Sequence, residues 1–109
     1  MSTLERLQRW YEDHCDGDWE HGYGVTVGTL DNPGWFVTVD VTGTPLASAA
    51  FSPIQDLDHE RDWLACKVEG GKFQGHGGPA QLERILDVFL SWAAQNGWQA
   101  PVAGDAHQR

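Results

Sequence analysis

The turn signature Asp-Asn-Pro-Gly at positions 31–34 limits the folds open to this chain more than any other feature. Proline presets the backbone at the first central position of a tight turn, glycine tolerates positive φ at the next, and an Asp or Asn side chain can bond back to the turn amides. Residues of alternating polarity lie on both sides of it, at 25–27 and 35–42. Such alternation is typical of strands with one buried face. We therefore predict a β-hairpin over residues 23–42.

The second arm of the hairpin also predicts which side chains enter the core. Side chains two positions apart share one face of a strand. One face would carry Trp35, Val37, Val39 and Val41, and the other Phe36, Thr38, Asp40 and Thr42. Two further apolar runs, 46–51 and 63–69, predict a third and a fourth strand on either side of a charged loop at 55–62. Residues 72–74, after a glycine turn, predict only a short extension of the fourth strand.

Helical patterns mark both ends of the sequence. Ser2 and Glu5 have the spacing of a capping box, and apolar residues then recur at helical intervals. The Asp-Gly-Asp cluster at 16–18 should end this helix near Cys15. Pro79 suits the first position of a second helix, whose apolar stripe continues to the Asn-Gly at 96–97.

These elements predict an α+β domain in the order α-β-β-β-β-α. The sheet would be an antiparallel four-stranded meander, with the N-terminal and the C-terminal helix packed on one face. A single domain would span residues 1–98, and residues 99–109, which have no pattern, would form a flexible tail.

The charge balance narrows the classes of partner. The chain has 16 acids against 7 bases, for a net charge of −9. A negative field of this size disfavours nucleic acid and anionic membranes and attracts basic proteins, although it also serves solubility. No apolar run approaches the roughly 20 residues of a membrane span, and the polar N-terminus does not resemble a signal peptide. We expect a cytoplasmic protein.

A cluster of potential metal ligands or catalytic groups lies at 14–21. It contains His14, Cys15, Asp16, Asp18, Glu20 and His21. Their spacing matches no zinc or calcium motif, and a cysteine at the C-terminal end of a helix, among acids, does not gain thiolate character. We therefore expect no metal, no cofactor and no catalysis. A small metal-binding enzyme using this cluster is kept as an alternative.

A docking surface fits the same residue types better. Tryptophans are enriched at binding hot spots, and carboxylates around them can pair with a basic partner. The predicted partner-binding residues are Asp16, Asp18, Trp19, Glu20, His21, Asp31, Asn32 and Trp35. The competing interpretation is that both tryptophans pack in the core. The acidic loop at 55–62 is a second candidate surface.

Two strings in this region carry a family resemblance. Cys-Asp-Gly-Asp-Trp-Glu-His at 15–21 and Thr-Leu-Asp-Asn-Pro-Gly-Trp at 29–35 resemble the signature of the immunity protein 53 family. The spacing to Asp40 and Thr44, the later pair at 62–63 and the C-terminal helix with Trp92 are also similar, so that the resemblance covers about residues 4–97.

The resemblance implies a small bacterial α+β protein, encoded beside a polymorphic toxin that it binds and neutralises, and not an enzyme. The acidic balance suggests a basic toxin domain, such as a nuclease, whose surface the 14–35 region would occlude. A generic acidic interaction module is the remaining alternative.

Overall fold

The computed structural model describes residues 1–58 and 60–99. The elements in chain order are α1 (Thr3–His14), α2 (Trp19–Gly22), β1 (Val25–Leu30), β2 (Gly34–Asp40), the 3₁₀ helix η1 (Pro45–Ser48), β3 (Ile54–Asp56), β4 (Leu64–Glu69), β5 (Lys72–Gly77) and α3 (Leu82–Gln95). The α+β class is confirmed, with a helix at each end and an antiparallel sheet between them. The predicted tail lies outside the described residues, apart from Gln99.

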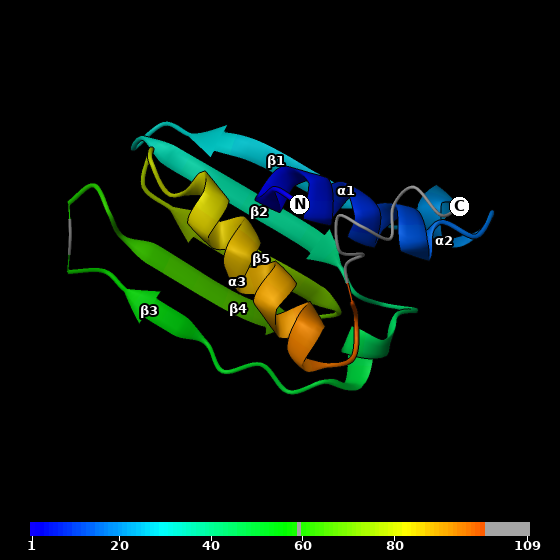
Figure 1. The fold of residues 1–109 in the computed structure, drawn as a ribbon. Coiled ribbons are helices and arrows are strands. Elements are labelled where there is room, and N and C mark those ends of the chain that lie inside the picture. The colour runs from blue at the N-terminus through cyan, green and yellow to red at the C-terminus, as the bar shows by residue number, and fades with distance from the viewer. Residues whose placement is uncertain (59, 100–109) are drawn as a thin grey trace.

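All five strands form one antiparallel sheet in the order β1-β2-β5-β4-β3. The predicted four-stranded meander was therefore wrong, because a fifth strand exists and β5 lies in the centre, between β2 and β4 (Figure 1). Gly70 and Gly71, both at positive φ, turn β4 directly into β5. The other edge of β5 then pairs with β2, with Val37 opposite Gly75. This second pairing joins strands far apart in the sequence, which local turn signals do not encode.

The predicted β1–β2 hairpin and its core face are both confirmed. Val37, Val39 and Val41 are at most 1% exposed. The role of Gly34 differs from the prediction, because it lies in β2 and its φ is not positive. A Cβ atom there would overlap the backbone carbonyl oxygen of Gly77 on β5. The role of Gly34 is therefore to let β2 and β5 approach closely. It does not supply the left-handed backbone conformation of a turn.

Residues 46–51 do not form the predicted third strand. The chain instead makes the 3₁₀ helix η1, which begins after Thr44, whose hydroxyl accepts a hydrogen bond from the Leu46 amide at 3.2 Å. Proline at the first helical position and a threonine cap favour a helical turn over a strand. Leu46 still enters the core, at 4% exposure. The third strand in sequence, β3, lies at 54–56, overlapping the segment predicted as a charged loop.

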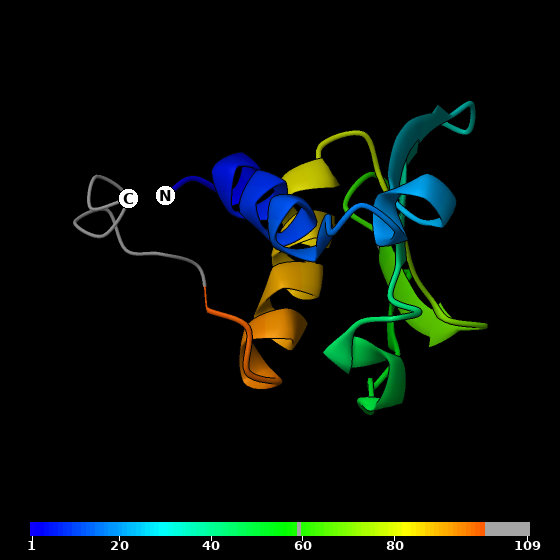
Figure 2. The same cartoon turned by 90° about the vertical axis from the view of Figure 1, so that its right-hand side faces the viewer.

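Helices α1 and α3 cover the same face of the sheet (Figure 2). The predicted capping box of α1 is confirmed: Ser2 Oγ accepts from the Glu5 amide at 3.1 Å, and the Glu5 carboxylate accepts from the Ser2 amide at 3.0 Å. Helix α3 begins at Leu82 and not at Pro79, with Gln81 as its N-cap. The buried core between helices and sheet consists of Leu7, Trp10, Trp19, Val37, Val39, Val41, Leu46, Leu64, Cys66, Phe73, Ile85, Leu86, Phe89, Leu90, Trp92 and Ala93.

Candidate protein-docking surface

Two carboxylates hold the loop between α1 and α2. Asp16 accepts hydrogen bonds from the amides of Asp18 and Trp19, both at 2.9 Å. Glu20 accepts from the amides of Asp16 and Gly17, at 3.0 and 2.9 Å. The hydrogen bond from the Trp19 amide, then that from Asp18, lowers the pKa of the Asp16 carboxyl. The pKa of Glu20 is lowered by its own backbone amide first, and by those of Asp16 and Gly17 after it. Both carboxylates are therefore ionised and act as internal braces.

The side chain of Trp19 is buried beneath this loop. It is 6% exposed, and its Nε1 donates to the carbonyl oxygen of Thr42 at 2.9 Å. Its ring meets that of Trp10 edge to face, with centroids 5.8 Å apart. Tyr11 and Tyr23 flank it, with ring centroids 6.0 and 6.1 Å away. Trp19 therefore joins α2 to the core, and the two tyrosines over it are the aromatic rings that solvent reaches.

Those two tyrosines were not among the predicted site residues. Tyr11 is 39% exposed and Tyr23 is 41% exposed. Tyr11 has the helical spacing of the apolar residues of α1, and Tyr23 is the first residue of the predicted hairpin. Their exposure follows from how far α1 lies over the sheet, a tertiary feature. Of the predicted residues at this end, Asp16, Asp18 and His21 are exposed, Glu20 is half-buried and Trp19 is buried.

The remaining predicted residues lie at the other end of the β1–β2 hairpin. Asp31 and Asn32 are exposed at its tip. Trp35 is half-buried, and its Nε1 donates to the carbonyl oxygen of Pro79 at 2.9 Å. Six residues of β1 separate the tip from the α2 end, a distance of roughly 20 Å along a strand. The structure thus places the eight predicted residues in two groups at opposite ends of one hairpin (Figure 1).

His14 and Cys15 near this surface have structural partners, and Cys66 is buried in β4. His14 Nδ1 lies 2.7 Å from the carbonyl oxygen of Trp10, and the two rings contact each other at a tilt of 35°, with centroids 4.3 Å apart. Cys15 Sγ donates to the carbonyl oxygen of Tyr11 at 3.2 Å. Burial raises the pKa of the Cys66 thiol to about 11, which keeps it protonated. Within residues 1–58 and 60–99, no three His, Cys, Asp or Glu side chains converge on a point that could hold a metal.

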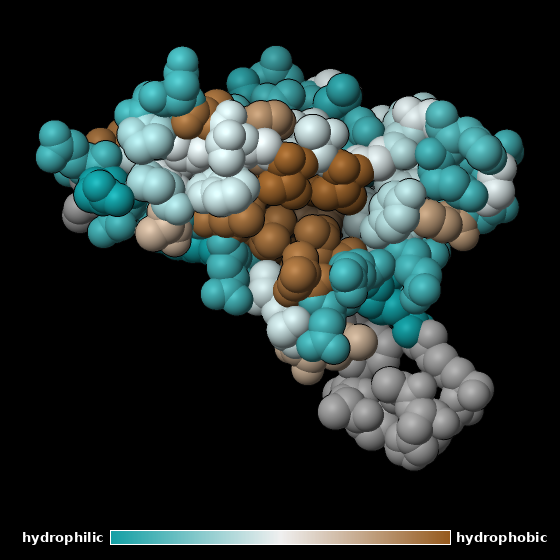
Figure 3. Space-filling view, turned by 90° about the horizontal axis from the view of Figure 1, so that it is seen from above, coloured by the Kyte–Doolittle hydropathy of each residue, from teal (hydrophilic) through white to brown (hydrophobic). Residues whose placement is uncertain are grey.

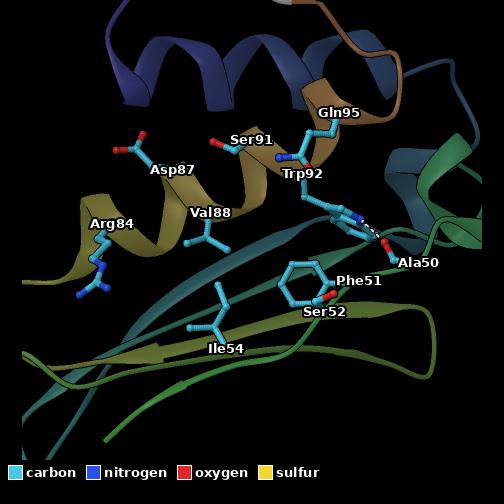
Figure 4. A pocket seen from close by; sticks show the side chains of 10 residues that line it. All are labelled: Ala50, Phe51, Ser52, Ile54, Arg84, Asp87, Val88, Ser91, Trp92 and Gln95. Carbon is cyan, nitrogen blue, oxygen red and sulfur yellow. Dashed lines mark hydrogen bonds between the residues drawn. The ribbon is translucent and has the colours of Figure 1, made fainter. Parts of the chain in front are cut away.

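A pocket of about 420 Å³ lies between α3 and the segment that leads into β3 (Figure 4). Val88 and Trp92 of α3 point toward Phe51 and Ile54, and Trp92 Nε1 donates to the carbonyl oxygen of Ala50 at 2.8 Å. The charged groups on its rim already serve the fold. Arg84 lies 3.8 Å from Asp56, and Asp87 accepts from the Thr3 hydroxyl at 2.8 Å. This pocket therefore offers little charge to a partner.

A second cavity, an apolar groove between α1 and β1, lies on another face of the molecule. Its volume is about 320 Å³, and it is lined by Leu7, Gln8 and Tyr11 of α1 and by residues 24–25 at the start of β1. Figure 3 shows a hydrophobic patch on this face, between α1 and β1. Exposed aromatic and apolar side chains beside a loop rich in acids define a surface suited to docking a protein.

The comparisons with known proteins agree with a docking protein. The chain matches the profile of the family described as immunity protein 53 over residues 4–94. Because this match covers most of the 109 residues, the chain belongs to the immunity protein 53 family. Membership indicates an immunity protein against a toxin, a class that is not in general enzymatic. No curated protein and no solved structure matched the chain. No helix in the described part of the chain has the length and apolar character needed to cross a bilayer.

Proposed function

We propose that this chain binds a cognate toxin and neutralises it by covering a basic surface of the toxin with the acidic end formed by α1 and α2. Membership of the immunity protein 53 family carries this proposal. The charge distribution supports the choice of a basic partner. A −9 chain attracts a positively charged protein over several ångströms and speeds the encounter.

Internal ion pairs leave this end with a surplus of negative charge. The two bases of α1 are already engaged: Arg9 contacts Asp13 at 2.8 Å, and Arg6 lies 3.8 Å from Asp87 of α3. Lys67 and Lys72 of the sheet pair with carboxylates in the same way. The basic side chains therefore do not neutralise the exposed carboxylates around the α1–α2 loop, and these carboxylates can attract a basic partner.

The predicted residues take different parts in this proposal. Asp18 and His21 would meet the toxin directly, because they are exposed and the loop beneath them is braced by Asp16 and Glu20. Trp19 would fix the position of that loop from below. Asp31, Asn32 and Trp35 would form a second contact with a toxin that extends along the hairpin; an interface of standard size, about 800 Å² on each partner, is wide enough for that.

Co-expression with the toxin encoded beside this gene tests the function itself. Cells that make the toxin alone should die, and cells that also make this chain should survive. The purified chain should then retain a catalytically inactivated form of that toxin in a pull-down. Continued cell death together with the absence of a complex would refute the proposal.

Charge reversal at Asp18 tests the surface. Asp18→Lys should weaken binding of the inactivated toxin by at least about fivefold at low salt, since a rim charge acts through attraction to the partner. Asp58→Lys makes the same charge change in the acidic loop at 55–62, on a distant and equally exposed segment. It should change the affinity by less than about twofold. The reverse ranking would place the toxin on the 55–62 loop.

A further inference from the structure

The outer edge of β1 is an exposed strand edge without the usual protection. β1 pairs only with β2 in the described sheet, so its other edge faces outward. Edge strands of natural proteins are commonly short or carry charged residues or proline, which prevents pairing with other chains. β3, at the opposite edge, has three residues, follows Pro53 and ends at Asp56. β1 has six residues, Val-Thr-Val-Gly-Thr-Leu, and none of them is charged or a proline.

The register shows which backbone groups of β1 point outward. The Asp40 amide donates to the carbonyl oxygen of Gly24 at 3.0 Å, and residues 24 and 40 are opposite in the β1–β2 register. Alternate residues of an antiparallel strand direct both backbone groups to the same neighbour. The even-numbered residues therefore bond to β2. The amides and carbonyls of Val25, Val27 and Thr29 point away from the sheet.

An apolar surface lies directly beside these backbone groups. Side chains of Val25 and Val27 are on the same face of the sheet as α1, yet Val27 is 43% exposed. Leu4 of α1 is 60% exposed, and the groove lined by Leu7 and Tyr11 continues between the helix and the strand (Figure 3). A strand added to β1 would bury these side chains on one face and pair with the free backbone groups along its length.

The outer rim of this groove, on the α1 side, carries acids. Glu5 and Glu12 are exposed beside Gln8, which lines the groove, and they lie about 100° around the helix from Leu4 and Tyr11. A second copy of this chain would bring two such acidic rims together, each on a chain of net charge −9. A basic segment would instead be attracted to them.

We propose that the groove between α1 and β1 receives an extended segment of the cognate toxin, which pairs with β1 as a sixth strand of the sheet. The segment would alternate apolar side chains, which enter the groove, with residues on the other face, and would carry Lys or Arg near Glu5 and Glu12. This inference rests on the proposed function, and it adds the mode of binding and the chemistry of the partner segment.

Two lysine substitutions on neighbouring residues of β1 test the groove. Val27→Lys places a charge in the groove, whereas Thr26→Lys adds the same charge to the same strand but on the open face of the sheet. Both side chains are exposed, and thermal unfolding should show that both variants fold. Binding of the inactivated toxin should fall at least about tenfold for Val27→Lys and less than about threefold for Thr26→Lys. Equal affinities for the two variants would overturn the proposal.

Amide hydrogen exchange measured by NMR tests the strand pairing itself. On addition of the inactivated toxin, the amides of Val25, Val27 and Thr29 should gain at least about tenfold protection, since they exchange freely until a partner strand accepts their hydrogen bonds. If the complex forms but amide exchange is unchanged, the strand-pairing proposal is refuted and the toxin-binding function is not. If the toxin does not bind the unmodified chain at all, the proposed function itself is refuted. A dimer of this chain alone, lost in Val27→Lys, would assign the groove to a second copy and overturn the proposal.

Discussion

The acidic cluster at 14–21 contains two kinds of carboxylate, which differ in their hydrogen bonding. Asp16 and Glu20 each accept hydrogen bonds from two backbone amides within the α1–α2 loop, so that their negative charge stabilises the fold. Asp18 lies between them in sequence and is exposed. The sequence alone does not separate these roles, because all three residues are acids around one glycine turn. Hydrogen-bond geometry separates them, and it predicts which substitution affects folding and which affects binding.

Acid titration should reveal the two braces. The pKa values of Asp16 and Glu20 are lowered in the folded state, so the unfolded chain binds protons more readily there than the folded chain. Their contribution to stability is therefore fully present above the unfolded values, 3.8 and 4.5, and is lost as the pH falls through the lower folded values. We expect the double variant Asp16→Asn, Glu20→Gln to be less stable at pH 7 and to lose less stability on acidification.

Urea unfolding monitored by tryptophan fluorescence, repeated between pH 7 and about pH 2.5, measures this difference. Asp18→Asn is the matched control, because its carboxylate accepts no backbone hydrogen bond in the described structure. It should follow the unmodified chain through the acid range. Parallel curves for the double variant and the unmodified chain would show that the two bracing carboxylates do not contribute.

The elements that the sequence predicted best are those stabilised by local signals. The capping box of α1, the β1–β2 hairpin and the alternation of β2 each depend on residues within a few positions of one another, and all three are confirmed. β5 was missed because its sequence, Lys-Phe-Gln-Gly-His-Gly at 72–77, contains two glycines that normally weaken a strand. Those glycines make room for α3, which no local pattern shows.

Substituting Gly75 tests that close packing. A Cβ atom at this position would overlap Cγ2 of Ile85 on α3 and touch the ring of Phe73. Gly75→Ala should therefore lower the free energy of unfolding by about 1–3 kcal/mol, the usual cost of overpacking a core. Gly22→Ala is the control, because a Cβ atom at Gly22 has no neighbour within 4 Å. Urea unfolding of the two variants measures the difference, and equal stability would show that α3 can move away from β5 without cost.

The candidate site was only partly predictable for the same reason. The sequence indicated an acidic, aromatic docking region at 14–35, and the exposed positions of Asp18, His21, Asp31 and Asn32 agree with that. It included the burial of Trp19 as a competing interpretation, which the structure bears out, but it did not indicate that two tyrosines over Trp19 stay exposed. Nor did it indicate the groove, which exists because α1 leaves the outer side of β1 uncovered. Such features depend on how elements pack, and the periodicity of each element alone does not contain that information.

At the scale of the whole molecule, acidic side chains lie next to an exposed apolar surface. Carboxylates of the α1–α2 loop and of the outer face of α1 lie near a groove with exposed Leu4, Tyr11, Tyr23 and Val27. The two kinds of group act at different stages of association. Long-range charge governs how often two proteins meet in the right orientation, whereas packed apolar contacts govern how long they stay together.

This division predicts separate kinetic effects for two variants. Asp18→Lys should lower the association rate constant for the inactivated toxin at low salt, and the deficit should shrink as salt screens the field, between about 20 and about 300 mM. Tyr23→Ala should leave association nearly unchanged and raise the dissociation rate constant at least about tenfold at every salt concentration, because it removes an exposed aromatic contact without removing charge. Surface plasmon resonance at several salt concentrations separates the two rate constants. If both variants altered the same rate constant with the same salt dependence, the acids and the tyrosines would not act as distinct parts of one docking surface. The toxin interface would then have to lie on another face of the sheet.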